Sequence, residues 1–269
     1  MTDDTWATAE SALSRHLREN PDVERALLES PLDGLNGADL FLRASVVEER
    51  SGFDAASDAY SLADERTYSS QVRHAREEML QRVVELVRGG DGKVVDVATG
   101  RGTLIERLLR ESERRLVATD VSPTVLQRVR DRLGGERVEY VTGDARELPF
   151  ADGEVATFVS HLGFANVSDA PRLLRELRRT GHHLFATHLF YPDDDDENRR
   201  VARELGLEEL LFRSEAFAAF DAAGWRLGVE LERDVPAEPT PPSALIEGVR
   251  IDALPAAPTR LVYCVLAAR

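Results

Sequence analysis

Two hydrophobic patterns alternate along the chain after residue 90. Short, mostly apolar runs occur at 94–97, 116–119, 138–141, 155–160 and 182–190, and several are followed by segments whose apolar positions recur every three or four residues. Short apolar runs are typical of buried strands, and the wider spacing is typical of amphipathic helices. The alternation predicts an α/β fold in which helices cover a central sheet.

Residues 1–90 show mainly the helical spacing. Trp6, Ala9, Leu13 and Leu17 fall on one helical face, Pro21 ends that pattern, and a later helix is expected from Ser69 or Ser70 to Gly89. Two strands, at 225–234 and 260–269, are expected to close the sheet as a pair across a proline-rich linker. We therefore predict a helical N-terminal cap over 1–90 and a ligand-binding α/β domain over 91–269.

The stretch KVVDVATGRGTL, residues 93–104, predicts a strand, a tight turn and the start of a helix. Gly100 and Gly102 allow the backbone to bend and to approach a ligand, and the first N–H groups of the new helix lack partners. Asp96 interrupts the apolar strand. Because a lone buried carboxylate is costly, we expect it to accept hydrogen bonds from the turn or from a cationic ligand group.

Two cofactor classes use such a turn, and its spacing separates them. A dinucleotide site favours G-x-G-x-x-G, whereas Ile105 stands here at the third glycine position. The order D-x-A-x-G-x-G resembles the first motif of class I S-adenosylmethionine (SAM) dependent methyltransferases, with Ala98 in place of that family's first glycine. The resemblance implies a Rossmann-like, seven-stranded mixed sheet and SAM as cofactor. A nicotinamide-dependent oxidoreductase and a non-catalytic SAM-binding protein remain the alternatives.

Two further strand ends carry acidic residues in register with this motif. Asp120 follows the glycine turn by about twenty residues, where one carboxylate can accept from both hydroxyls of a ribose; its alternative role is to stabilise a helix N-terminus. The G-D-A sequence at 143–145 resembles the family's adenine-reading motif. That resemblance implies that Asp144 accepts from the exocyclic amine and that the Ala145 N–H meets a ring nitrogen.

The expected catalytic groups lie at the ends of the fourth and fifth strands, beside the reactive methyl group in this family. His161 is the first candidate for a general base with a pKa near 7, and His188 is the reserve. Tyr60, Tyr68 and Arg73 are candidates to reach over the cofactor from the cap. The predicted cofactor-binding residues are Tyr68, Asp96, Ala98, Thr99, Gly100, Gly102, Asp120, Val121, Asp144, Ala145 and Ser160.

Residues 93–188 also resemble the quinone-biosynthesis C-methyltransferases, which implies a small-molecule acceptor. The chain departs from those enzymes at Ala165, where they have arginine before Asn-Val, and at 179–181, where Arg-Thr-Gly replaces Pro-Gly-Gly. Both departures count against a quinone as the specific substrate. The methylated atom and the oligomeric state are not indicated by the sequence.

Composition and charge limit the partners and sites that we expect for this chain. A net charge of −15 disfavours nucleic acid as a partner, and no apolar run is long enough to predict a membrane span. The first ten residues lack a signal-peptide pattern, so we expect a cytoplasmic protein. Cys264 is the single cysteine, which excludes an internal disulfide and a cysteine-based metal site. The acidic run 193–197 is interpreted as a helix cap, and no metal site is predicted.

Overall fold

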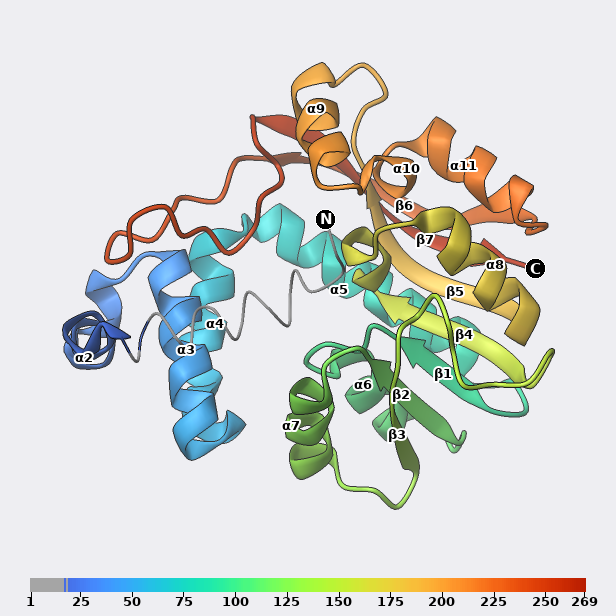
Figure 1. Cartoon of the computed structure of the whole chain (residues 1–269), viewed down its shortest axis with the longest axis horizontal. Coiled ribbons are helices and arrows are strands. Elements are labelled where there is room, and N and C mark those ends of the chain that lie inside the picture. Colours follow the sequence, from blue (N-terminus) through green and yellow to red (C-terminus); the bar gives the residue numbers. More distant parts are fainter. Residues whose placement is uncertain (1–16, 18) are drawn as a thin grey trace. The chain divides into compact units, whose positions relative to one another are not determined.

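The structure is a computed structural model that describes residue 17 and residues 19–269 (Figure 1). The helical face predicted from Trp6, Ala9 and Leu13 lies outside the described residues, whereas Leu17 is buried. The chain divides into two compact units. Unit 1 contains residues up to 73 together with 237–258, and unit 2 contains 74–236 together with 259–269.

This division differs from the domain boundary expected near residue 90. Helix α5 (Ser70–Val87) begins in unit 1 and continues into unit 2, so most of it belongs with the sheet. Its apolar side chains Met79, Val83 and Val87 are buried. The 237–258 linker, expected to be a loop of the α/β domain, belongs with the N-terminal helices.

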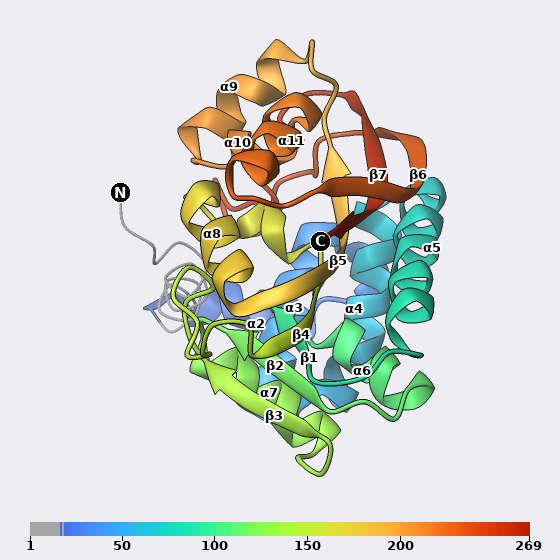
Figure 2. The same ribbon diagram turned by 90° about the vertical axis from the view of Figure 1, so that its right-hand side faces the viewer.

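Unit 2 is built on a seven-stranded sheet in the order β3-β2-β1-β4-β5-β7-β6. Figure 2 shows these strands from β3 at the bottom of the view to β6 near the top. The first five strands pair in parallel, and β7 runs antiparallel to β5, which confirms the predicted mixed sheet. The strands are β1 (Val94–Val97), β2 (Leu116–Asp120), β3 (Val138–Thr142), β4 (Val155–His161), β5 (Gly181–Phe190), β6 (Leu227–Ala237) and β7 (Thr259–Ala268).

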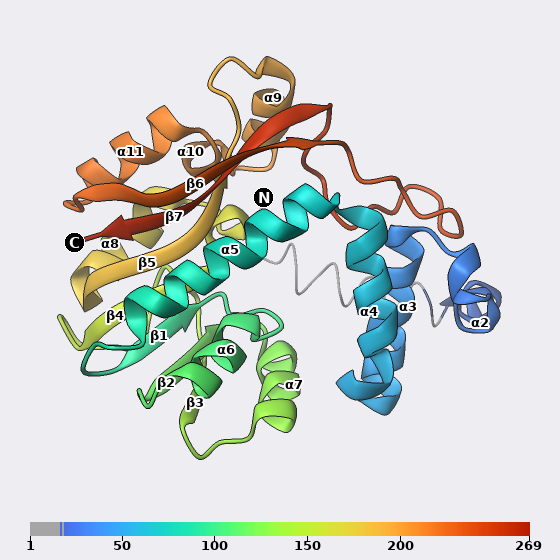
Figure 3. The same cartoon turned by 180° about the vertical axis from the view of Figure 1, so that it is seen from behind.

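Helices cover both faces of this sheet, as predicted. Figure 3 shows α5 and α6 crossing one face, and Figure 1 shows α8 and α11 on the other. Ser122 caps α7 by accepting from the Val125 N–H, and Pro123 occupies its first position, as the sequence indicates. The remaining helices of unit 2 are α6 (Thr103–Glu111), α7 (Pro123–Leu133), α8 (Ala170–Thr180), α9 (Asp196–Glu204), α10 (Glu208–Leu211), α11 (Arg213–Ala222) and the 3-10 turn η2 (Gly163–Asn166).

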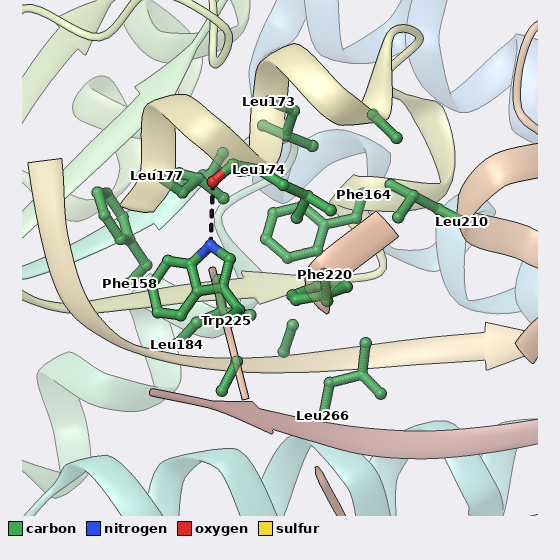
Figure 4. Close-up of a cluster of buried hydrophobic side chains, with 14 of the residues drawn as sticks. Phe158, Phe164, Leu173, Leu174, Leu177, Leu184, Leu210, Phe220, Trp225 and Leu266 are labelled. Atoms are coloured by element: carbon green, nitrogen blue, oxygen red, sulfur yellow. Dashed lines mark hydrogen bonds between the residues drawn. The ribbon is translucent and has the colours of Figure 1, made fainter. Parts of the chain in front are cut away.

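The main core of unit 2 lies between the sheet and the layer of α8 and α11 (Figure 4). Phe158 from β4, Leu177 from α8 and Phe220 from α11 are fully buried there. Trp225 fills the centre and donates its indole N–H to the Leu174 carbonyl at 3.0 Å. This packing fixes β4 and β5, whose carboxyl ends carry the candidate catalytic residues.

Unit 1 is a helical body closed by a returning segment of chain. It contains α2 (Pro21–Glu29), the 3-10 turn η1 (Leu32–Gly34), α3 (Gly37–Ser51) and α4 (Phe53–Thr67). The buried Asp39 carboxylate accepts from the Ser243 hydroxyl at 2.5 Å and from the Ala244 N–H at 3.1 Å. Because a buried carboxylate left unpaired is costly, these bonds hold 237–258 against α3. In the described part of the chain, no helix meets the length and hydropathy of a membrane span.

Candidate functional site

The turn after β1 has the tightly bent backbone that its sequence predicts. Gly100 and Gly102 adopt φ values of +51° and +74°, and Gly102 is the N-cap of α6. A Cβ on Gly100 would meet nothing within 4 Å, whereas one on Gly102 would lie 2.6 Å from a methyl group of Val129. Gly100 therefore faces open space above the strand end, and Gly102 permits α6 to approach α7.

Replacing each glycine by alanine should separate these roles. We expect Gly102→Ala to lower the free energy of unfolding by about 2–4 kcal/mol, because strain and overpacking add together. Gly100→Ala should cost only about 1 kcal/mol of stability, since its site is open. Urea unfolding of both variants measures the difference. Equal losses of stability in the two variants would show that the Val129 side chain moves away from an added methyl group at no cost in free energy.

Ala98 takes the left-handed conformation, at φ +54°, where the related family has glycine. Its methyl group points toward the turn after β4: a Cβ added to Gly163 would lie 2.9 Å from the Ala98 Cβ. Leu162, the residue before Gly163, is also left-handed at φ +58°. The absence of a side chain at Gly163 thus accommodates the extra methyl. Sequence reasoning missed this partner, because the two residues lie on different strand ends.

Asp96 is the buried carboxylate that the sequence singles out. It is 1% exposed, and its Oδ2 accepts from the Thr99 hydroxyl, which confirms the expected bond from the turn. Its Oδ1 has no hydrogen-bond partner among the described residues. Burial raises the pKa of Asp96 to about 7, opposed by the Thr99 bond and reinforced by the charge of Asp120. The site therefore contains an acceptor oxygen that a cationic ligand would satisfy.

Asp120 joins the turn after β1 to the start of α7. Its Oδ2 accepts from the Gly100 N–H and its Oδ1 from the Ser122 N–H, both at 3.0 Å. A carboxylate is the group that would accept from the hydroxyls of a ligand at this position. The next residue, Val121, is 54% exposed, which leaves a large apolar side chain at this edge of the sheet. The arrangement suits a ribose with an apolar surface beside it, and the assignment remains a prediction.

Asp144 is held by a residue that sequence reasoning overlooked. It accepts from the backbone N–H of Arg146 at 2.8 Å and from its guanidinium at 2.6 Å. These bonds lower the pKa of Asp144, which stays ionised as an acceptor. The sequence signal for this pair was an arginine two residues after the aspartate, in the order Asp-Ala-Arg. Ala145 is partly buried against the core, and the contact of its N–H with a ligand remains a prediction.

The hydroxyl groups of Ser160 and Thr99 already have partners within the protein. Ser160 is fully buried and donates to the Val97 carbonyl at 2.8 Å, which ties β4 to β1. Thr99 is largely buried and bonds Asp96. Both residues were predicted to bind the cofactor directly. In this structure their side chains shape the turn, and direct contact with a ligand remains a prediction.

His161 lies at the end of β4, as predicted, but its expected pKa near 7 is wrong. Its Nδ1 is 2.8 Å from the Thr187 hydroxyl on β5. Burial, followed by the charges of three arginines, lowers the pKa of His161 to about 3. An imidazole with that pKa is neutral at pH 7 and is a weak base. It can still donate or accept a hydrogen bond as a neutral ring.

His188 does not face a ligand site. It is 1% exposed, its Nε2 lies 2.7 Å from the Leu210 carbonyl, and its ring packs edge-on against Phe190. Burial lowers its pKa to about 4. His188 lies on β5, as predicted, but its side chain is buried against α10. Its reserve role as a base remains a prediction, which this burial disfavours.

The cap residues all have partners within unit 1. The Tyr68 hydroxyl donates to Asp252 at 2.7 Å and the Tyr60 hydroxyl to Glu48 at 2.6 Å. A cofactor contact by Tyr68 remains a prediction.

The acidic run and the single cysteine have structural roles. Asp195 caps α9 by accepting from the Asn198 N–H, as interpreted from the sequence, and the described residues form no cluster of three potential metal ligands. Cys264 is buried, and burial raises the pKa of its thiol to about 12, which makes it unreactive.

Comparison with known proteins identifies the class of this site. Residues 94–181 match the profile of a family described as a methyltransferase domain. A demethylmenaquinone methyltransferase of Thermotoga maritima is 40% identical over 102 residues, which cover 37% of this chain and 43% of that protein. Residues 94–181 therefore correspond to a methyltransferase domain, in agreement with the predicted resemblance to class I SAM-dependent methyltransferases.

Other relatives of the methyltransferase domain differ in their named substrates. A demethylmenaquinone methyltransferase of Thermobifida fusca is 35% identical over 131 residues, covering 47% of this chain and 53% of that protein. A malonyl-[acyl-carrier protein] O-methyltransferase of Erwinia pyrifoliae is 34% identical over 112 residues, covering 40% and 42%. The chain thus spans about half, or less, of the length of these relatives.

Solved structures share the fold of the methyltransferase domain. The YcgJ protein of Bacillus subtilis superimposes with a TM-score of 0.55 at 16% identity, covering 73% of this chain and 97% of that one. A geranyl diphosphate methyltransferase in complex with SAM gives a TM-score of 0.54 at 16% identity, covering 81% and 90%. At these identities the likeness concerns the fold alone.

The residues of the methyltransferase domain fit SAM. The unpartnered Oδ1 of Asp96 suits a cationic ligand, Gly100 leaves space above β1, and Asp120 places a carboxylate at the neighbouring strand end. Parallel strands bring these groups to one edge of one sheet, where ligands of such folds bind.

Proposed function

We propose that this protein is an enzyme that transfers a methyl group from SAM to a small-molecule acceptor. The observation that carries the proposal is the set of acidic groups at successive strand ends, Asp96, Asp120 and Asp144, beside the open Gly100 turn. Bound SAM supplies a methyl group that is already strongly electrophilic. The protein then has to hold the cofactor, align the acceptor in line with the methyl group and exclude water.

Each acidic group has a proposed task in holding the cofactor. Asp96 faces a cationic group with its unpartnered oxygen, Asp120 accepts from the ribose hydroxyls, and Asp144 accepts from the adenine amine. The methyl acceptor approaches from the ends of β4 and β5, near His161. The relatives' names support a small organic acceptor, and the departures at Ala165 and at Arg179-Thr180 argue against the quinone itself. We also propose a cytoplasmic location.

Titration calorimetry with SAM tests cofactor binding. We expect a dissociation constant in the micromolar range that is typical of enzyme ligands, and no binding of NAD(H) under the same conditions. S-adenosylhomocysteine, the demethylated product, should bind as well, because it keeps the adenosine and amino acid groups. Binding of NAD(H) without binding of SAM would contradict the proposal and favour an oxidoreductase.

A second measurement separates an enzyme from a binding protein of the same fold. Incubation with methyl-labelled SAM and a panel of small phenols, enols, acids and amines should label at least one acceptor. SAM binding with no transfer to any member of the panel would favour a non-catalytic SAM-binding protein.

A further inference from the structure

His161 lies where the end of β4 meets the turn after β1. β4 pairs in parallel with β1, with Val159 opposite Asp96. Two residues after His161, Gly163 approaches the Ala98 methyl group so closely that an added Cβ would lie 2.9 Å from it. His161 therefore stands beside the turn that we propose holds the cofactor, on the side from which an acceptor would approach.

The Thr187 hydroxyl decides which nitrogen of His161 carries the proton. Its oxygen lies 3.0 Å from the Leu162 N–H, which can only donate, and 2.8 Å from His161 Nδ1. Thr187 is 1% exposed, and its single hydroxyl hydrogen has no other acceptor among the described contacts. If that hydrogen is donated to Nδ1, all three groups are satisfied. If Nδ1–H donated instead, a buried hydroxyl hydrogen would be left unpaired, which is costly.

The neutral ring of His161 therefore carries its proton on Nε2. No described residue bonds that nitrogen, and His161 is only half-buried, so the N–H is available to a ligand. A second proton on the ring would have to sit on Nδ1, where the Thr187 hydroxyl already donates. The geometry thus favours His161 as a hydrogen-bond donor through Nε2–H and not as a base that accepts a proton.

Three arginine side chains add to the effect of burial in lowering the pKa of the His161 imidazole. They are Arg76 on α5, Arg101 in the turn after β1 and Arg107 on α6. Arg107 is paired with Glu77 and Gln81, which holds its guanidinium in place, and Glu111 lies 3.8 Å from it. These arginines oppose a second proton on the ring, so the ring acts as a neutral donor.

We infer that His161 donates its Nε2–H to an anionic oxygen of the methyl acceptor, and that Thr187 is the positioning residue for this bond. The inference rests on the proposed methyl transfer and gives the substrate class: a small molecule with a phenolate, enolate or carboxylate oxygen at its reacting end. When such an acceptor binds ionised, its electron pair forms the new bond to the methyl carbon. The electrons of the broken methyl–sulfur bond stay on sulfur, and no proton is removed in that step.

Nitrogen-15 NMR of the full chain, labelled at histidine, tests the protonation state without any acceptor. We expect a resonance pair of the Nε2–H tautomer that is absent from His161→Gln and does not titrate between about pH 5 and pH 8. Thr187→Val should lose the fixed tautomer, and Thr187→Ser should restore it. A His161 that titrates near pH 6–7, or that carries its proton on Nδ1, would overturn the inference.

Turnover with two probes tests the donor role. 1,4-Naphthalenediol serves as the oxyanion-forming acceptor and benzylamine as the cationic one, and SAM affinity is measured for every variant. His161→Gln keeps an N–H near the Nε2 position and should retain diol methylation within about tenfold, whereas His161→Met should lose about 10- to 100-fold. SAM affinity should stay constant in both.

The possible outcomes distinguish failure of the His161 inference from failure of the proposed methyl transfer. The inference would be overturned if His161→Gln and His161→Met lost the same activity and the acidic limb of the pH profile disappeared, because that result would assign a general base. A preference for benzylamine over the diol would overturn it as well. Failure of the wild type to bind SAM would instead remove the proposed function. If neither probe is methylated, the NMR result alone decides the role of His161.

Discussion

Asp96→Asn should make the protein more stable at pH 8 while weakening its binding of SAM. The folded-state pKa of about 7 lies above the ordinary value of 3.8 for an aspartate side chain, so folding favours the protonated carboxyl. Stability from this group is present below about pH 4 and is lost as the pH rises through 7. The difference corresponds to ~4 kcal/mol of charge burial at high pH. Asparagine removes this charge but leaves an unpaired N–H, which costs about 1–3 kcal/mol.

We therefore expect a net gain of about 1–3 kcal/mol in the free energy of unfolding at pH 8, and no gain or a small loss at pH 4. Urea denaturation at the two pH values measures this change. The same variant should bind SAM at least tenfold more weakly, because the cationic ligand loses its facing carboxylate.

Thr99→Val is the matched control for this prediction. It removes the one hydrogen bond that stabilises the Asp96 carboxylate, so it should destabilise the protein more at pH 8 than at pH 4. At pH 8 its expected change in the free energy of unfolding is therefore opposite in sign to that of Asp96→Asn. If Asp96→Asn and the wild type showed the same pH dependence of stability from pH 5 to 8, the raised pKa would be refuted.

Asp120→Ala should cause the largest loss of cofactor affinity. The alanine removes the proposed acceptor for the ribose hydroxyls and also frees the N–H groups of Gly100 and Ser122, so the turn loses its support. Each lost bond to a charged acceptor contributes about 1.5–3 kcal/mol, so SAM binding should weaken by roughly 100-fold or more. Titration calorimetry measures the change.

Two variants control for the loss of Asp120. Asp120→Asn keeps one acceptor oxygen and should lie between the wild type and the alanine variant. Asp131→Ala removes an exposed acid from α7 and should leave SAM affinity unchanged. An affinity in Asp120→Ala within a few-fold of the wild type would show that the ribose is bound elsewhere.

The sequence by itself determined the fold and predicted the cofactor edge of the site. Apolar periodicity, the glycine turn and the capping residues are local signals, because each depends on neighbours within a few residues along the chain. Parallel strands then place their carboxyl ends together, which is why spacing alone could place Asp96, Asp120 and Asp144 at one edge of the sheet. The acidic run before α9 was likewise interpreted correctly as a cap.

Only the tertiary structure decided the state of each ionisable side chain. The pKa of a histidine depends on its burial and on charged groups from other helices and strands. Neither can be predicted from the residues next to it in the sequence. His161 meets Thr187 from the next strand, and His188 is covered by α10, so one remains at the site and the other does not. The association of 237–258 with the N-terminal helices was hidden for the same reason, since Asp39 and its partner Ser243 are 204 residues apart.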